Sequence, residues 1–200
     1  MKKEIEILYD HYKETCLNNK DLENKREKLI IYILLILTLF SIQFYSPDQA
    51  INAISKAIEY KFGSSFNISF SGFLSLTWGL LTIISIRYFQ ICIQIERQYS
   101  YIHSLEPLID KEIGGDIFKR EGAGYLDRYP KFSNWTWILY TWVFPLGLIL
   151  IVITKTVLEI KTYSSSYFGL SILNIILSII ITVSSILYLF AIHYKKDSSS

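Results

Sequence analysis

The stretch TYSSSYFGLSILNIILSIIITVSSILYLFAIHY, residues 162–194, contains no Asp, Glu, Lys or Arg. Three further runs without these charges occupy residues 29–47, 62–86 and 132–154. At about 1.5 Å of rise per residue, about 20 apolar residues cross a hydrocarbon core of roughly 30 Å, and each run reaches or nearly reaches that length. Soluble helices seldom run so far without a charged face. We therefore expect an all-α polytopic membrane protein with four transmembrane helices.

The distribution of lysine and arginine predicts how the four spans are oriented. Seven of these residues precede the first run, seven lie in residues 87–131, and two follow Tyr194. The other two connections, residues 47–61 and 155–161, hold two each. Because cytoplasmic loops carry the excess of Lys and Arg, both termini and the long connection are expected in the cytoplasm.

This topology divides the chain into eight expected segments. They are a cytoplasmic amino-terminal helix (1–28), the first span (29–46), an outer interfacial helix (47–62), the second span (66–87), a cytoplasmic helical connection (88–131), the third span (132–154), the fourth span (163–194) and a cytoplasmic tail (195–200).

The short outer connection has a helical signature of its own. Ser46 is expected to cap a helix that has Pro47 in its first turn, and Gly63 is its expected stop. Isoleucines recur at helical spacing on one face, opposite polar residues, which is typical of a helix lying in the membrane interface. Bracing the bundle is the favoured role of this helix, with a lid over an opening as the alternative.

The apolar pattern of the second span continues beyond Arg87, without glycine or proline before Pro107. We therefore expect this span to project into the cytoplasm as one long helix. The amino-terminal segment offers a packing partner, because its own apolar residues also share one side. The two faces comprise Ile91, Ile95, Ile102 and Leu105 on the long helix, and Ile5, Leu8, Tyr12 and Cys16 on the amino-terminal one.

A row of polar side chains follows one face of the fourth span. Lipid offers no partner for hydroxyl or amide groups, so this face should turn toward other helices or toward water. Hydrogen-bonded helix packing is one interpretation, and a pore in an oligomer, uncharged and weakly selective, is the other. The candidate pore-lining residues are Ser171, Asn174, Ser178, Thr182 and Ser185.

The second and third spans carry patterns that indicate structure rather than function. Small residues let helix backbones approach closely, so the face of Gly72, Ser75, Gly79 and Thr82 is expected to pack against another helix. In the third span, Pro145 and Gly147 are expected to bend the helix.

Basic and aromatic residues alternate between Gly114 and Lys131. Such a pattern is typical of a site that binds a nucleotide or a short oligonucleotide. Acidic neighbours weaken this interpretation, because they repel an anionic ligand or pair with the basic groups. The alternative is a loop anchored at lipid headgroups. The candidate ligand-sensing residues are Lys119, Arg120, Tyr125, Arg128 and Lys131.

The sequence offers no basis for an enzyme. The three histidines are far apart and lack partners at ligand spacing, so no catalytic residue, metal site or cofactor is expected. The four runs themselves contain no ionisable Asp, Glu, Lys or Arg, which argues against a secondary transporter driven by an ion gradient.

The layout resembles that of the small multi-span membrane effectors of bacterial antiphage defence systems. The points of resemblance are the long helix leaving the second span and the segment from Phe118 to Phe132. The resemblance implies a multi-pass protein of the bacterial inner membrane that oligomerises and permeabilises the membrane when a nucleotide or oligonucleotide signal arrives.

Two hypotheses of function follow from these patterns. The first is a homo-oligomeric, signal-gated pore or ion channel that depolarises the inner membrane. The alternative is a non-conducting membrane anchor that docks a soluble cytoplasmic protein on its helices. In both cases the lipid bilayer is a partner.

Overall fold

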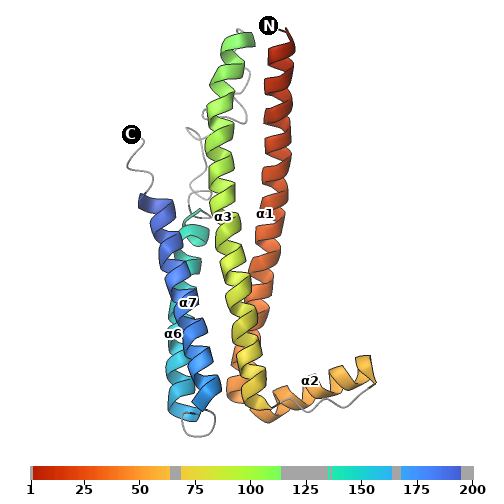
Figure 1. The fold of residues 1–200 in the computed structure, drawn as a ribbon, viewed down its shortest axis with the longest axis vertical. Coiled ribbons are helices and arrows are strands. Elements are labelled where there is room, and N and C mark those ends of the chain that lie inside the picture. Colours follow the sequence, from red (N-terminus) through yellow and green to blue (C-terminus); the bar gives the residue numbers. More distant parts are fainter. Residues whose placement is uncertain (1, 64–68, 114–134, 136, 164–167, 195–200) are drawn as a thin grey trace. The chain divides into compact units, whose positions relative to one another are not determined.

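The computed structural model describes residues 2–63, 69–113, 135, 137–163 and 168–194 (Figure 1). All secondary structure within these ranges is helical, which confirms the all-α class. The elements are α1 (Lys2–Tyr45), α2 (Pro47–Phe62), α3 (Phe70–Ile113), the π-helical η2 (Leu139–Val143), α6 (Phe144–Tyr163) and α7 (Phe168–His193).

Four helical segments are long and apolar enough to cross a membrane, as the sequence predicts. The chain thus has the architecture of a multi-pass membrane protein. The candidate spans are Ile5–Tyr45, Phe70–Ile113, Leu139–Lys161 and Ser171–His193.

Two of the helices are much longer than a membrane crossing. Both α1 and α3 have 44 residues, or about 66 Å, roughly twice the thickness of the hydrocarbon core. The expected amino-terminal helix and first span are therefore one element, because neither glycine nor proline interrupts residues 2–45. The extension of the second span is also present, and α3 continues through Pro107 to Ile113.

The chain forms two compact units. Unit 1 comprises Met1–Lys28, Phe89–Pro145 and Tyr188–Ser200, and unit 2 comprises Leu29–Tyr88 and Leu146–Leu187. Unit 2 holds most of the uncharged sequence, whereas unit 1 holds most of the charged sequence.

In unit 1, the first part of α1 packs on the second part of α3. Tyr12 is buried in one cluster with Ile102, Leu105 and Ile109, and Leu8 and Cys16 of α1 pack against it. The Tyr99 hydroxyl donates a hydrogen bond of 2.8 Å to the Glu23 carboxylate. The predicted pairing of these two apolar faces is confirmed.

The π-helical turn η2 brings two tryptophans onto one histidine, also within unit 1. The His193 ring stacks on Trp142 with centroids 4.0 Å apart and meets Trp137 edge-on at 5.7 Å. The turn ends two residues before Pro145, which has no N–H to donate to a preceding carbonyl. A wider helical turn thus lies beside this proline, and the bend expected from Pro145 and Gly147 stays a prediction.

In unit 2, α2 turns away from the long helices and extends across their direction (Figure 1). It occupies the expected residues, and Gly63 ends it in a left-handed conformation (φ 67°) with its N–H bonded to the Glu59 carbonyl. The expected side-chain cap is wrong, because the Ser46 hydroxyl makes no capping hydrogen bond. Pro47 begins the helix without a side-chain cap.

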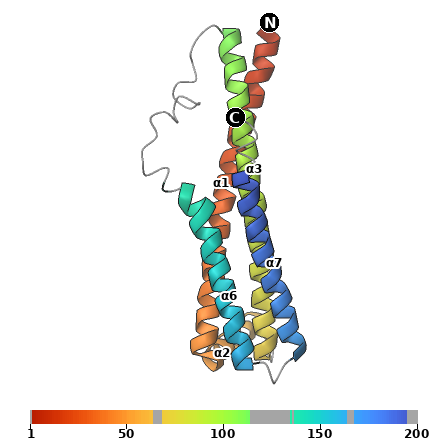
Figure 2. The ribbon, with the colours of Figure 1, turned by 90° about the vertical axis from the view of Figure 1, so that its left-hand side faces the viewer.

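Two neighbouring helices, α6 and α7, complete unit 2 and lie side by side in both views (Figure 2). Buried aromatic and aliphatic residues from four of its helices form the apolar core. The most deeply buried of these include Ile33, Trp78, Leu81, Val152 and Ile181.

Candidate functional site

The central feature of unit 2 is a pair of opposite charges buried on α6. Lys155 Nζ lies 3.4 Å from Glu159 Oε1, and the two side chains are only 9% and 11% exposed. The sequence analysis ends the third span at residue 154 and assigns these residues to an outer connection. The structure corrects this view, because α6 continues to Tyr163 and the candidate span extends to Lys161. Lys155 and Glu159 are therefore part of the same helix as the apolar stretch that precedes them, and not of a separate connection.

The sequence carries a signal for this burial. Leu148, Val152, Lys155 and Glu159 follow one another at spacings of four, three and four residues, which places them on one face of a helix. Leu148 and Val152 are completely or almost completely buried, and the charged pair continues their row. Opposite charges at positions i and i+4 can neutralise each other on a helix surface.

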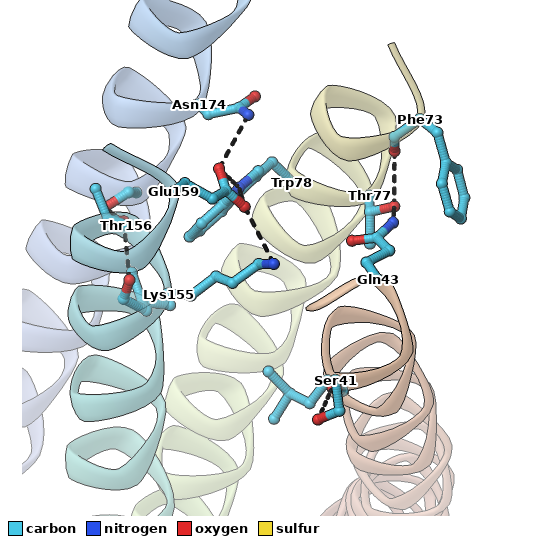
Figure 3. A network of polar contacts seen from close by, with 12 residues as sticks. Ser41, Gln43, Phe73, Thr77, Trp78, Lys155, Thr156, Glu159 and Asn174 are labelled. Carbon is cyan, nitrogen blue, oxygen red and sulfur yellow. Dashed lines mark hydrogen bonds and ion pairs between the residues drawn. The ribbon is translucent and has the colours of Figure 1, made fainter. Parts of the chain in front are cut away.

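The Glu159 carboxylate also accepts hydrogen bonds from two neighbouring helices (Figure 3). Nε1 of Trp78 on α3 lies 3.1 and 3.0 Å from the two carboxylate oxygens. Nδ2 of Asn174 on α7 donates across 3.2 Å. Since Trp78 is fully buried, its indole N–H depends on this carboxylate as a partner.

The ammonium group of Lys155 turns toward a different helix. Its Nζ lies 5.2 Å from the ring centroid of Phe40 on α1, within the range of a cation–π interaction. The Phe40 ring in turn lies 4.9 Å from Trp78. These contacts connect all four long helices of unit 2. We call the residues that make them the Glu159 cluster, which consists of Phe40, Trp78, Lys155, Glu159 and Asn174.

Two further polar contacts connect helix pairs in the same unit. Gln43 of α1 donates its amide to the Thr77 hydroxyl of α3 at 2.9 Å, and Thr77 donates to the Phe73 carbonyl at 2.8 Å. The hydroxyls of Thr156 on α6 and Ser178 on α7 lie 2.8 Å apart and share a hydrogen bond. Together with Asn174, Ser178 therefore fixes α7 to α6.

The candidate pore-lining residues face the interior of unit 2. Asn174, Ser178 and Ser185 are buried, whereas Ser171 and Thr182 are half-buried. Thr182 and Ser185 donate hydrogen bonds to carbonyls of their own helix, those of Ser178 and Ile181. In this single chain, Asn174 and Ser178 are contacts between α6 and α7, and they can line a path only after these helices separate.

The expected packing face of the second span is only partly buried. Ser75 and Thr82 are buried, and Thr82 bonds to the Trp78 carbonyl. A methyl group added at Gly79 would meet no other described atom within 4 Å, so none of the described helices approaches closely there. One added at Gly72 would lie 3.1 Å from the hydroxyl of Ser69, just before the same helix.

The candidate sensing residues Lys119, Arg120, Tyr125, Arg128 and Lys131 lie outside the described residues. Within the described ranges, no group of His, Cys, Asp or Glu side chains has an arrangement that suits a metal ion.

Comparisons with known proteins give no relatives: no family model, curated protein or solved structure matches the chain. Its function must be argued from the Glu159 cluster and the helices that carry it.

Proposed function

We propose that the protein is a gated ion-conducting pore, described here in a closed conformation. The observation that supports it is the polar face of α7 buried against the charged pair of α6 within the candidate spans. Charged residues in membrane helices are costly, and a buried ion pair can often be replaced by apolar residues with no loss of stability. Helix packing alone therefore does not explain why Lys155 and Glu159 occupy buried positions on α6.

Opening separates α7 from α6. Two described side-chain hydrogen bonds join these helices, Asn174 to Glu159 and Thr156 to Ser178. Hydrogen bonds between membrane helices contribute about 0.6 kcal/mol each on average, and a bond to a charged acceptor such as Glu159 contributes about 1.5–3 kcal/mol. Binding of a signal can therefore supply enough free energy to break both hydrogen bonds, as a gate requires.

Conduction requires several copies of the chain. Four helices close on their own side chains, as the buried residues of unit 2 illustrate, so a path forms between protomers or after their rearrangement. With both termini in the cytoplasm, the long connection would meet a cytoplasmic nucleotide or oligonucleotide signal. Depolarisation of a bacterial inner membrane in antiphage defence is the role that the architectural resemblance implies.

Flux through liposomes tests the assigned lining. We expect purified oligomers to release an entrapped ion, and we expect Asn174→Leu combined with Ser178→Leu to reduce the flux through each open pore severalfold, because both polar groups leave the path. Ile179→Leu is the matched control, since Ile179 lies on the exposed face of the same helix. Equal flux from the double variant and the wild type would show that the lining is wrong.

The sensing region has a separate test in cells. Loss of both Lys119 and Arg120 should abolish the response to the trigger, because the basic groups that bind an anionic signal are gone, while assembly in detergent persists. An undiminished response would favour the alternative that this segment anchors at lipid headgroups.

The second candidate is a non-conducting anchor for a soluble protein. It is favoured by apolar side chains of unit 1 that remain about half exposed on α1 and α3, among them Ile7, Tyr9, Leu17, Tyr101 and Leu108. Copurification of a soluble protein in stoichiometric amount, together with the absence of any conductance, would decide for this function.

A further inference from the structure

We infer that the permeant of the proposed pore is a small inorganic cation, selected by the carboxylate of Glu159. This inference rests on the proposed function and adds a chemical class to it. It also replaces the expectation of an uncharged, weakly selective path, because that expectation assigned Glu159 to a loop.

The two charges of the buried pair face different helices (Figure 3). The carboxylate of Glu159 accepts a hydrogen bond from the amide of Asn174, so the carboxylate lies on the side of α6 that α7 covers. The ammonium of Lys155 lies over the Phe40 ring of α1. When α7 leaves α6, the carboxylate loses its Asn174 partner, whereas Lys155 keeps its contact with α1.

The surfaces that separate are rich in oxygen. The α6 side presents the Glu159 carboxylate and the Thr156 hydroxyl, and the α7 side presents the Ser178 hydroxyl. The Asn174 carbonyl oxygen is buried and accepts no hydrogen bond from the described residues, so it adds a further ligand atom. Carboxylate, carbonyl and hydroxyl oxygens are the ligands that hard cations prefer.

An anion would meet the opposite conditions. The indole N–H of Trp78 points at the Glu159 carboxylate and does not leave with α7. Any anion that approached this N–H would be repelled by that carboxylate at close range in a region of low dielectric constant. Rings of Asp or Glu select cations in other channels for the same reason.

Reversal potentials in planar bilayers under a KCl gradient test this inference with the full-length protein. We expect the wild type to favour K⁺ over Cl⁻, because the Glu159 carboxylate lies on the side of α6 that α7 covers, whereas the Lys155 ammonium lies toward α1. Glu159→Gln leaves the Lys155 ammonium without its counter-charge, so the ratio of K⁺ to Cl⁻ permeability should fall to one or below. Glu159→Asp, which keeps the charge, should retain the preference for K⁺.

An exposed carboxylate of the same unit provides the control. Glu59 lies on the surface of α2, and its side chain makes no described hydrogen bond, so Glu59→Gln should leave the ratio at the wild-type value.

Each outcome of the experiment decides something. Current without a cation preference in the wild type, or a Glu159→Gln ratio equal to that of the wild type, would overturn this inference alone. The absence of any current would overturn the proposed function and the inference together. If Glu159→Gln fails to fold, the wild-type ratio and that of Glu159→Asp still decide.

Discussion

The Glu159 carboxylate combines an ion pair with hydrogen bonds from two other helices, so its charge matters for the whole bundle. Its partners are Lys155 on the same helix, Trp78 on α3 and Asn174 on α7. Removing one partner of a buried pair leaves an uncompensated charge, which costs about 3–5 kcal/mol, whereas removing both can be nearly neutral. The difference between the cost of the single change and the cost of the double change therefore distinguishes an ion pair from two polar residues that do not interact.

A double-mutant cycle measures the coupling between the two charges. We expect Lys155→Met to destabilise the protein in detergent by about 3 kcal/mol, and Lys155→Met combined with Glu159→Gln to recover most of that loss. Thermal unfolding followed by circular dichroism provides the measurement. Strictly additive effects of the two changes would contradict the described pairing.

The indole N–H of Trp78 can be removed while its ring is largely kept. Trp78→Phe loses a hydrogen bond to a charged acceptor, so we expect destabilisation by about 2 kcal/mol, part of it from the smaller ring. Trp142→Phe is the control, because Trp142 is 41% exposed. Equal effects of the two changes in the same unfolding measurement would count against a bond from Trp78 to Glu159.

At the scale of single elements, the paired ends of α1 and α3 depend on few buried residues. Ile109 is fully buried in the cluster around Tyr12, whereas the neighbouring Leu108 is 51% exposed. Ile109→Ala should therefore loosen the first part of α1, at a local cost of about 2–4 kcal/mol, while Leu108→Ala should change little.

Hydrogen–deuterium exchange of residues 5–28 measures that loosening. We expect faster exchange in Ile109→Ala than in Leu108→Ala and the wild type. Identical exchange in all three would show that α1 does not rely on this cluster.

Much of this architecture was predictable from charge and periodicity. The four spans, the range of α2, its stop at Gly63 and the pairing around Tyr12 all follow from patterns that one element carries by itself. Such features need no knowledge of neighbouring helices.

What could not be predicted depends on partners from other helices. Lys155 is the first charged residue after the third apolar run, so the sequence alone indicates that the span ends there. Its burial is tolerable because Glu159 lies beside it and the Phe40 ring of another helix lies across from it. Likewise, the glycine at position 79 suggested a close helix contact, but none of the described helices approaches it. The central residues of the candidate site were missed for this reason, although the spacing of Leu148, Val152, Lys155 and Glu159 indicates them.

For the whole molecule, the central claim is that the protein conducts ions only when α7 separates from α6. The contact between Thr156 and Ser178 allows this separation to be blocked, because their hydroxyl oxygens lie 2.8 Å apart and cysteines there are close enough for a disulfide. The native cysteines, Cys16 and Cys92, form no disulfide within the described residues.

The decisive measurement is ion flux from liposomes containing the Thr156→Cys, Ser178→Cys double variant, before and after oxidation, with the wild type and each single variant as controls. The account predicts that oxidation stops the flux of the double variant only, and that a reductant restores it. Undiminished flux with the disulfide fully formed would contradict the claim that α6 and α7 must separate.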